Sequence, residues 1–482
     1  MLSDDKRTVA RVTLVVDSPY RDLPGMAILA MRLCSNGFQC YLSPYRFQDI
    51  LETSPDFVLL PYLRTGNQDR VHQIANTGIR VGILDTEGGV AMPGVDTFAN
   101  IIGDSKSVRQ EISLYCAWAQ CIADCLVEKG LFNSSQLEVT GTPRMDFYSD
   151  PWKDAILEIT SEQNDYNDNL ILFNGNFGAG NPGAGIGTMT NKMLADAFNP
   201  DLANSIESNQ KQALRLMANL ANKVAARFPE STVVYRPHPF EGLDIYRDLL
   251  NSLPNLHLVR EGPIYGWILR AKAVIQRGCS TAIEAGIAGV PAFSPIWVPL
   301  GWEIPNTDSA SVMCESEEVI LNSIDDVLNN RFEYPQKVKY SIDQLTRDWF
   351  QDCDGKSHQR VSNVITKILS GNGTQISDKK RHQLIQELGN MSAPSSPTLT
   401  SRIRKFAKFP LRLLPTHQTD QGENDEKENH TYLEIKQTQN LFDAIYRASK
   451  GDKSLELPSV IVKIAKEVTN HEKPSFEISI DV

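Results

Sequence analysis

Apolar runs and amphipathic stretches alternate through the first half of the chain. Runs rich in β-branched and aromatic residues predict strands, and stretches with apolar residues three or four positions apart predict helices between them. The expected strands lie at 11–17, 38–44, 56–64, 79–89 and 137–141. The block 107–130 reads as one helical stretch. Strand–helix–strand alternation with short connections is typical of a parallel sheet with helices on both faces.

A second alternating series begins at residue 169, after a polar and irregular segment. Strands are expected at 169–174, 232–235 and 256–261, with a long helix at 209–228. Two more strands are expected within 262–295, and the first of them ends with VIQ at 274–276. The pattern predicts an α/β protein with two Rossmann-like domains that face a cleft. Ligands of such folds bind outside the carboxyl ends of the strands.

The expected domain organisation follows from these breaks in pattern. Residues 1–150 form the N-terminal, acceptor-side Rossmann-like domain, 151–168 the hinge, and 169–340 the C-terminal, nucleotide-binding Rossmann-like domain. Residues 341–370 are expected to be helical and to return to the first domain.

Beyond residue 370 the composition becomes polar, so we expect a partly disordered C-terminal tail. A flexible linker is predicted at 371–440 and a small helical appendage at 441–482. Within the linker, 401–415 carries five Lys and Arg among apolar residues and no acidic residue. This basic amphipathic segment is expected to bind an anionic membrane surface. The alternative is docking on the protein's own acidic surface.

Composition narrows the class of protein. The chain has 482 residues, 41% hydrophobic and 22% charged, which indicates a globular protein with more than one domain. A formal net charge of −11 argues against nucleic acid as a partner. The eight cysteines have no CxxC spacing, and neither a signal peptide nor an apolar membrane span is evident. We expect a cytoplasmic protein, peripheral on the inner face of the cell membrane.

Two strand-end segments of the second half carry groups suited to phosphate. Arg236 and His238 follow a strand, and Pro237 and Pro239 stiffen the backbone on both sides of the histidine. Gly278, Ser280 and Thr281 open a helix after another strand, where hydroxyls and backbone N–H groups bind anions. The alternatives are a surface histidine in a turn and ordinary helix capping.

Two further candidates come from the same half of the chain. Glu284 is one turn into the same helix and could reach a ribose. Asn174, Gly175 and Asn176 begin a glycine-rich loop that we expect to approach a ligand or the other domain closely. The chain has no Walker A motif, so ATP hydrolysis is not expected. We expect neither a metal nor a cofactor other than a nucleotide-linked substrate.

The first half offers a candidate general base. Asp85 and Glu87 lie at the end of the strand expected at 79–89, and Gly88 and Gly89 follow them. A carboxylate at a strand end can take the proton from an incoming hydroxyl. An acidic turn is the alternative.

Taken in order, these motifs resemble those of the two-domain GT-B glycosyltransferases that use CMP-activated sugars. Bacterial sialyltransferases, polysialyltransferases and Kdo transferases of capsule assembly share an acidic pair before glycine, an HP dipeptide and a Ser-Ser/Thr pair. The matching residues are Thr86-Glu87-Gly88, His238-Pro239 and Ser280-Thr281. Thr86 departs from the acidic pair, so either Glu87 or Asp85 is the base.

The chain resembles still more closely the surface carbohydrate biosynthesis protein family, over about residues 10–370. The matching segments are DTEGG, TGTPRMD, RPHPFE, the block 263–294 and KSHQRV. The resemblance implies that Glu87 acts as base, that His238 assists the leaving CMP phosphate, and that Ser280 and Thr281 bind it.

The predicted function is therefore an inverting, metal-independent glycosyltransferase of cell-surface polysaccharide synthesis. It would transfer a sialic acid-like or Kdo-like sugar from a CMP-linked donor to a glycan or lipid-linked glycan acceptor. CDP-glycerol phosphotransferases of teichoic acid synthesis also carry an HP dipeptide and an ST…EA block, so a CDP-alcohol phosphotransferase is one alternative. A non-catalytic polysaccharide assembly factor is the other.

Overall fold

The computed structural model describes residues 9–45, 47–88, 90, 94–166, 169–183, 200–301, 304–371, 383–384, 386, 435–450, 457, 460–464 and 476–480. The chain divides into two compact units. Unit 1 comprises Met1–Gly88, Phe98–Asp146 and Asp354–Val482, and unit 2 comprises Gly89–Thr97 and Phe147–Cys353.

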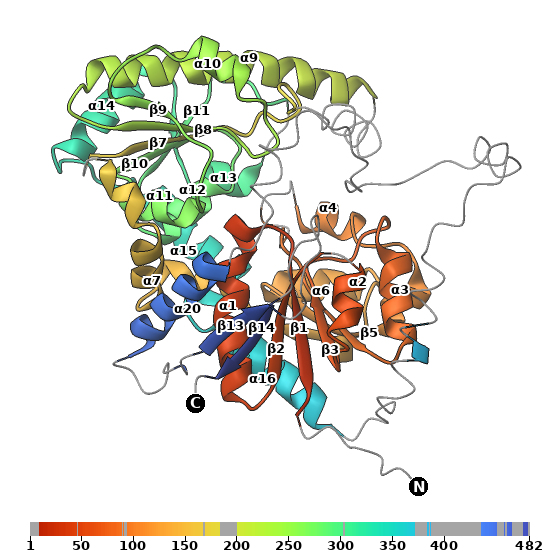
Figure 1. Cartoon of the computed structure of the whole chain (residues 1–482). Helices are drawn as coiled ribbons and strands as arrows, with labels where there is room; N and C mark the ends of the chain where they lie inside the picture. Colours follow the sequence, from red (N-terminus) through yellow and green to blue (C-terminus); the bar gives the residue numbers. More distant parts are fainter. Residues whose placement is uncertain are drawn as a thin grey trace, which may run out of the picture. The chain divides into compact units, whose positions relative to one another are not determined.

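Unit 1 contains an eight-stranded sheet in the order β13-β14-β2-β1-β3-β4-β5-β6 (Figure 1). Its strands are β1 (Arg11–Val16), β2 (Gln39–Pro44), β3 (Phe57–Leu60), β4 (Arg80–Leu84), β5 (Ile112–Ala117), β6 (Leu137–Val139), β13 (Val460–Ile464) and β14 (Phe476–Ile480). The six strands from β2 to β6 are parallel, whereas β14 is antiparallel to β2 and β13 to β14. The central strands are apolar and almost fully buried, as expected of a sheet covered on both faces.

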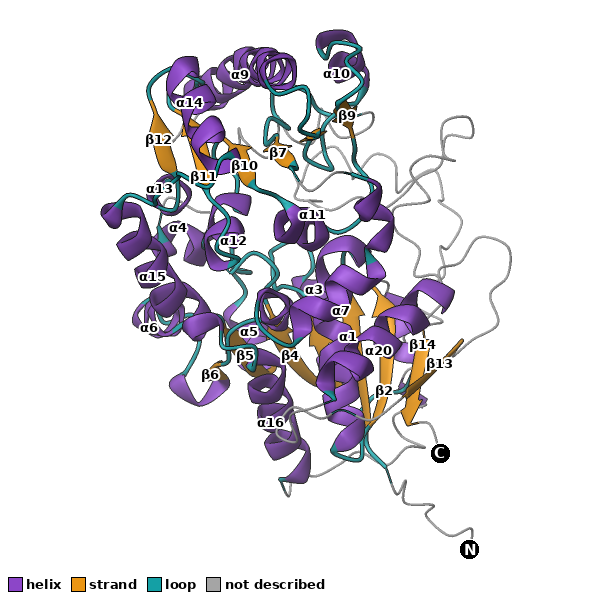
Figure 2. Ribbon diagram, turned by 90° about the vertical axis from the view of Figure 1, so that its left-hand side faces the viewer, coloured by secondary structure: helices purple, strands orange, loops and turns teal. Residues whose placement is uncertain are grey.

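The helices of unit 1 lie on this sheet. They are α1 (Pro19–Ser35), α2 (Phe47–Glu52), α3 (Gln68–Asn76), α5 (Lys106–Glu111), α6 (Gln120–Glu128), α16 (Ser357–Ser370) and α20 (Ile435–Ser449), with the 3₁₀ turn η1 (Ser134–Gln136). Two elements, α4 (Val95–Asn100) and the 3₁₀ turn η2 (Pro143–Tyr148), cross the boundary between the units. The long helix α1 contacts both α16 and α20, so segments from the two ends of the chain share one layer (Figure 2).

Unit 2 contains a six-stranded, entirely parallel sheet in the order β12-β11-β10-β7-β8-β9. Its strands are β7 (Ile171–Asn174), β8 (Val233–Arg236), β9 (Leu256–Leu258), β10 (Ala273–Gln276), β11 (Ala292–Pro295) and β12 (Val312–Cys314). Its helices are α7 (Trp152–Ile159), α9 (Pro200–Arg227), α10 (Asp244–Leu249), α11 (Ile264–Arg270), α12 (Thr281–Ile287), α13 (Pro305–Ser309), α14 (Glu317–Leu328) and α15 (Gln336–Phe350), with the 3₁₀ turns η3 (Ser161–Asp165) and η4 (Gln351–Cys353). The buried face of α9 packs with β7, β8 and β10 in one hydrophobic core.

The predicted α/β class with two Rossmann-like halves is confirmed. Two strands were missed within residues 1–340. The stretch 107–130 is not one helix, because Ile112–Ala117 forms β5 between α5 and α6. Five of its six residues are buried, and they include the β-branched Ile112 and the aromatic Tyr115, which favours a central strand. The three-residue edge strand β12 is too short for a periodic pattern.

The C-terminal end differs from the expected helical appendage at 441–482. Among the described residues of this range, the end of α20 is helical, and β13 and β14 extend the sheet of unit 1. The sequences VIVKI and FEISI are β-branched or alternating, which favours strands. The basic segment 401–415 and almost all of the predicted linker lie outside the described residues. Its membrane role stays a prediction.

The segment expected as an irregular hinge, 151–168, contains α7 and η3. The chain re-enters unit 1 at Asp354, and α16 follows. Asp146 of the TGTPRMD motif fixes the start of α16. Its carboxylate accepts hydrogen bonds from the backbone N–H of Ser357 (3.0 Å) and His358 (2.9 Å), and it lies 2.9 Å from His358 Nδ1. The TGTPRMD and KSHQRV motifs therefore contact each other through Asp146, Ser357 and His358.

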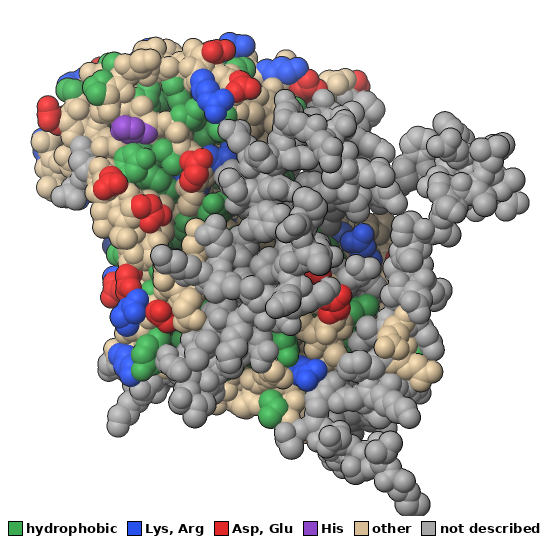
Figure 3. All heavy atoms as spheres, viewed as in Figure 1, with side chains coloured by type: hydrophobic (Ala, Val, Ile, Leu, Met, Phe, Trp, Pro, Cys, Tyr) green, Lys and Arg blue, Asp and Glu red, His purple; other side chains and the backbone are tan. Residues whose placement is uncertain are grey.

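Within the described ranges, no helix carries an apolar stretch long enough to cross a bilayer. On the described part of the face seen in Figure 3, acidic and basic side chains are interspersed and form no single-sign patch.

Candidate functional site

Each sheet reverses its direction of strand addition at one point. In unit 1 the strands on either side of β1 are β2 and β3, and in unit 2 the strands on either side of β7 are β8 and β10. Ligands of open parallel sheets bind outside the carboxyl ends of the strands at such a reversal. The structure places predicted site residues at this point in unit 2 and after β4, the neighbour of β3, in unit 1. Each unit is described by itself.

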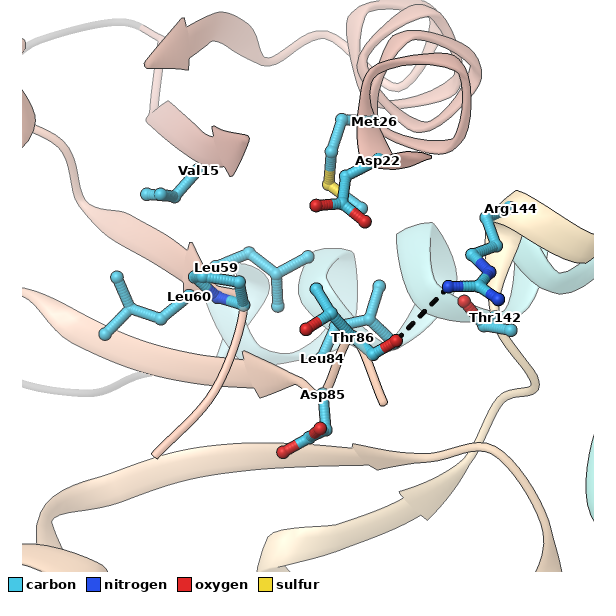
Figure 4. A pocket seen from close by; sticks show the side chains of 11 residues that line it. Val15, Asp22, Met26, Leu59, Leu60, Leu84, Asp85, Thr86, Thr142 and Arg144 are labelled. Atoms are coloured by element: carbon cyan, nitrogen blue, oxygen red, sulfur yellow. Dashed lines mark hydrogen bonds between the residues drawn. The ribbon is translucent and has the colours of Figure 1, made fainter. Parts of the chain in front are cut away.

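In unit 1 a small pocket lies at the carboxyl ends of β1, β3 and β4 (Figure 4). Its lining residues are Val15, Asp22, Met26, Leu59, Leu60, Pro61, Leu84, Asp85, Thr86, Thr142 and Arg144. The cavity volume is about 20 Å³, enough for one ordered water. Apolar side chains form most of its wall, and Asp22 and Arg144 supply charges of opposite sign.

Asp85 is a buried ion-pair partner. Its two carboxylate oxygens accept hydrogen bonds from the Arg64 guanidinium, at 2.6 and 3.0 Å. One of them also accepts the backbone N–H of Glu87 at 3.0 Å. The Asp85 side chain is 1% exposed. Both oxygens are thus occupied by protein donors, and the carboxylate is too buried for direct contact with a substrate hydroxyl.

Glu87 is accessible and belongs to a charged network. Its side chain is 51% exposed, and one oxygen accepts a hydrogen bond from Arg21 at 3.0 Å. The same guanidinium also donates to Asp17 and Asp22. Burial raises the pKa of Asp17, and the nearby Arg21 opposes that rise. Glu87 therefore has a fixed orientation and an exposed carboxylate.

The backbone conformation and packing of Gly88 explain why the first glycine of the TEGG motif is required. Its φ is +57°, and a Cβ there would lie 2.1 Å from the Trp118 ring. The indole N–H donates to the Asp85 carbonyl at 2.8 Å, and the Arg144 guanidinium lies over the ring, 5.4 Å from its centroid. The glycine thus lets Trp118 pack beneath the acidic loop.

In unit 2, His238 follows β8 on the loop that the sequence predicted. Its backbone N–H donates to Glu241 Oε1 at 2.8 Å, and its Nδ1 accepts the Phe240 N–H at 3.2 Å. Because Nδ1 is an acceptor, a neutral imidazole carries its proton on Nε2. The half-buried ring therefore has a defined tautomer.

The Arg236 guanidinium forms most of its hydrogen bonds with backbone carbonyl groups of the same unit. It donates to the carbonyl oxygens of Arg260, Glu261 and Gly262, at 2.6 to 3.2 Å. It also lies over the Trp267 ring, 5.8 Å from the centroid. This geometry fixes the end of β9 and weighs against a phosphate as its main partner.

The glycine-rich loop after β7 lies beside the start of α12. Asn176 Nδ2 donates to the Gly278 carbonyl at 2.8 Å, and the Gly175 N–H donates to the Arg236 carbonyl at 2.9 Å. Asn174, at the end of β7, is 3% exposed, and its Nδ2 has no hydrogen-bond partner among the described residues. Gly278 has a φ of +65°, and a Cβ there would clash with Leu300.

The predicted phosphate and ribose residues differ in environment. Ser280 is half-buried at the start of α12, and its side chain makes no capping hydrogen bond. Thr281 is 7% exposed, beside the thiol of Cys279, whose pKa is raised by burial. Glu284 is 3% exposed and accepts a hydrogen bond from the Tyr148 hydroxyl at 2.7 Å. A ribose hydroxyl bound to Glu284 would compete with the Tyr148 hydroxyl for this carboxylate.

The structure thus gathers the predicted residues of unit 2 at one sheet edge. Sequence reasoning assigned no role to Glu241, Arg21, Asp17, Asp22 or Arg144. Glu241 lies in the RPHPFE motif and Arg144 in the TGTPRMD motif, so these motifs could have identified the two residues from the sequence. The network around Arg21 joins residues 66 positions apart and gave no local signal. No cluster of three or more His, Cys, Asp or Glu suited to a metal ion occurs in the part of the chain that the structure describes.

No family model and no curated protein matches the chain. Among solved structures, it is similar to the UDP-GlcNAc 2-epimerase of Neisseria meningitidis bound to UDP-GlcNAc, with 14% identity, a TM-score of 0.47, and coverage of 74% of this chain and 100% of that one. It is also similar to the UDP-GlcNAc 2-epimerase of Methanocaldococcus jannaschii, with 11% identity, a TM-score of 0.48, and coverage of 74% of this chain and 99% of that one. The wall teichoic acid polymerase TagF is similar with 11% identity, a TM-score of 0.47, and coverage of 76% of this chain and 91% of that one. At these identities and TM-scores, the likenesses assign neither a family nor an activity.

Proposed function

We propose that the chain is an inverting glycosyltransferase of the surface carbohydrate biosynthesis family, with a CMP-linked sugar as donor. Two kinds of support combine. The motifs Thr86-Glu87-Gly88, His238-Pro239 and Ser280-Thr281 resemble those of CMP-sugar transferases. The same motifs lie at the carboxyl ends of strands at or beside the reversal of each sheet.

The observation that carries the proposal is the edge of unit 2 at β7, β8 and β10. Three segments lie at or just after the carboxyl ends of these adjacent strands: Asn174–Asn176, His238 and Gly278–Thr281. The buried Asn174 amide nitrogen there has no partner among the described residues. Because buried polar groups are nearly always hydrogen-bonded, such a nitrogen favours a bound polar ligand.

His238 has a role that its geometry allows. As the sugar–phosphate bond breaks, negative charge develops on the departing CMP. Because Nδ1 accepts the Phe240 N–H, a neutral imidazole carries its proton on Nε2, and this is the nitrogen that would donate to that phosphate. Proline on either side holds the backbone of this loop, so the imidazole needs little reorganisation.

Glu87 is the better candidate for the base. Its carboxylate is half exposed, whereas both oxygens of Asp85 are bound by Arg64. In the proposed step the acceptor oxygen forms a bond to the anomeric carbon while the bond from that carbon to the phosphate oxygen breaks. The acceptor proton passes to Glu87 and the electron pair leaves with CMP, so the anomeric configuration inverts.

Turnover with a panel of donors tests the proposal. The protein is incubated with acceptor glycans and CMP-sialic acid, CMP-Kdo, CDP-glycerol or UDP-GlcNAc, and the consumed donor is identified. We expect consumption of a CMP-sugar. Consumption of CDP-glycerol alone would favour the phosphotransferase, and binding of nucleotide without turnover of any donor would favour an assembly factor.

A further inference from the structure

Glu241 is a buried carboxylate for which the proposed reaction has no use. It ends the RPHPFE motif and is 1% exposed. Its Oε2 accepts a hydrogen bond from the Tyr246 hydroxyl. Burial raises its pKa, and the hydrogen bonds from Tyr246, Phe177 and His238 oppose that rise. An ionisable group is costly to bury, so its contacts indicate what it does.

The other oxygen joins two loops. Glu241 Oε1 accepts the backbone N–H of His238 at 2.8 Å and that of Phe177 at 3.1 Å. Phe177 belongs to the loop after β7, and His238 to the loop after β8. The backbone N–H of Glu241 also donates to the His238 carbonyl at 2.8 Å. The peptide groups on both sides of His238 are therefore held by one residue.

The imidazole depends on this turn. Its Nδ1 accepts the Phe240 N–H, and its ring packs edge-to-face on Phe240, with 5.0 Å between centroids. Phe240 directly precedes Glu241, so a shift of Glu241 moves the group that defines the tautomer. Glu241 itself is too buried to touch a substrate.

We propose that Glu241 is a positioning residue that holds the His238 loop against the β7 loop and thereby fixes the orientation and tautomer of the His238 imidazole. The consequence for catalysis rests on the proposed function, because it requires His238 to act on the leaving phosphate. The effect on the imidazole itself does not.

Three variants separate positioning from general stability. Glu241→Ala removes both loop contacts. Glu241→Gln keeps an oxygen for the two N–H groups and an amide that can donate to the Tyr246 oxygen. Tyr246→Phe is the matched control, since it removes one buried hydrogen bond and leaves both loop contacts of Oε1. Glu241→Asp, with a carboxylate too short for both N–H groups, replaces the alanine variant if that does not fold.

The first readout is the ¹⁵N spectrum of histidine-labelled full-length protein, with His238 assigned from His238→Gln. We expect one Nε2–H tautomer in wild type, Glu241→Gln and Tyr246→Phe, and a tautomer mixture in Glu241→Ala. An unchanged His238 signal in Glu241→Ala would overturn the proposal. This readout needs no turnover, so it stands apart from the fate of the proposed function.

The second readout is kcat with the consumed donor. Glu241→Ala should lower kcat about 10- to 100-fold, the size expected of a misplaced catalytic group, and Glu241→Gln should stay within about threefold of wild type. In a His238→Ala background the further loss should be below about twofold, because the residue acts through the histidine. An equal loss in both backgrounds, or equal losses in Glu241→Ala and Tyr246→Phe, would indicate a structural role only.

Discussion

At the residue scale, the acidic loop after β4 shows what a sequence can and cannot specify. The pattern identified Asp85 and Glu87 as strand-end carboxylates but left open which one is the base. The difference depends on Arg64 and Arg21, which contact Asp85 and Glu87 from other segments. Such partners are set by tertiary packing, so no local pattern reveals them. His238 was identifiable because two prolines mark its loop.

The two carboxylates should differ in their effect on stability. Asp85→Ala leaves the Arg64 guanidinium without its buried partner, which should lower the free energy of unfolding by about 3–5 kcal/mol. Glu87→Ala removes an exposed ion pair and should cost less than about 1 kcal/mol. Urea denaturation of both variants beside wild type measures the difference. Equal midpoints would contradict the assignment of Asp85 as a structural residue.

Asp17 should make stability depend on pH. Its pKa is raised above the usual 3.8, chiefly by burial, so the folded chain binds its proton more tightly than the unfolded chain. The stability it contributes is present below pH 3.8 and is lost as the pH rises through the raised value. Asp17→Asn cannot ionise. The variant should therefore gain stability relative to wild type as the pH increases across that window, measured by urea denaturation at several pH values. A pH-independent difference would contradict the raised pKa.

At the scale of elements, the strands at the centre of each sheet were predictable and those at its margins were not. β1, β3, β7 and β10 are short buried apolar runs. β12 has only three residues, and β13 and β14 follow a stretch of polar composition that suggested a tail. Their pairing with β2 and with each other joins the last residues of the chain to a strand formed at residue 39, a contact that sequence periodicity does not encode.

The helix α20 should therefore be part of the core of unit 1. Phe442 is 1% exposed, and Phe442→Ala should lower the free energy of unfolding by about 3–5 kcal/mol. Asn440→Ala, at an exposed position of the same helix, should change it by less than about 0.5 kcal/mol. Chemical denaturation compares the two. If Phe442→Ala unfolds at the same denaturant concentration as Asn440→Ala, α20 does not contribute to the core.

At the scale of the whole molecule, the proposed function divides the chemistry between the units, with nucleotide binding in unit 2 and proton abstraction in unit 1. The two Rossmann-like halves were predictable from alternation of pattern, whereas the return of residues from Asp354 onward to unit 1 involves contacts such as that of Asp146 with His358. Substitutions in the two units should therefore have different effects on nucleotide binding and on turnover.

Calorimetric titration of CMP into wild type, His238→Ala and Glu87→Ala, with initial rates for the same three proteins, tests this division most directly. His238→Ala should weaken CMP binding and slow turnover by about 10²–10³-fold, as expected for loss of a preorganised charge stabiliser. Glu87→Ala should bind CMP like wild type and slow turnover by about 10²–10⁴-fold, as expected for loss of a general base. Normal CMP binding and normal turnover in His238→Ala would contradict the account, because the histidine would then be only a turn residue.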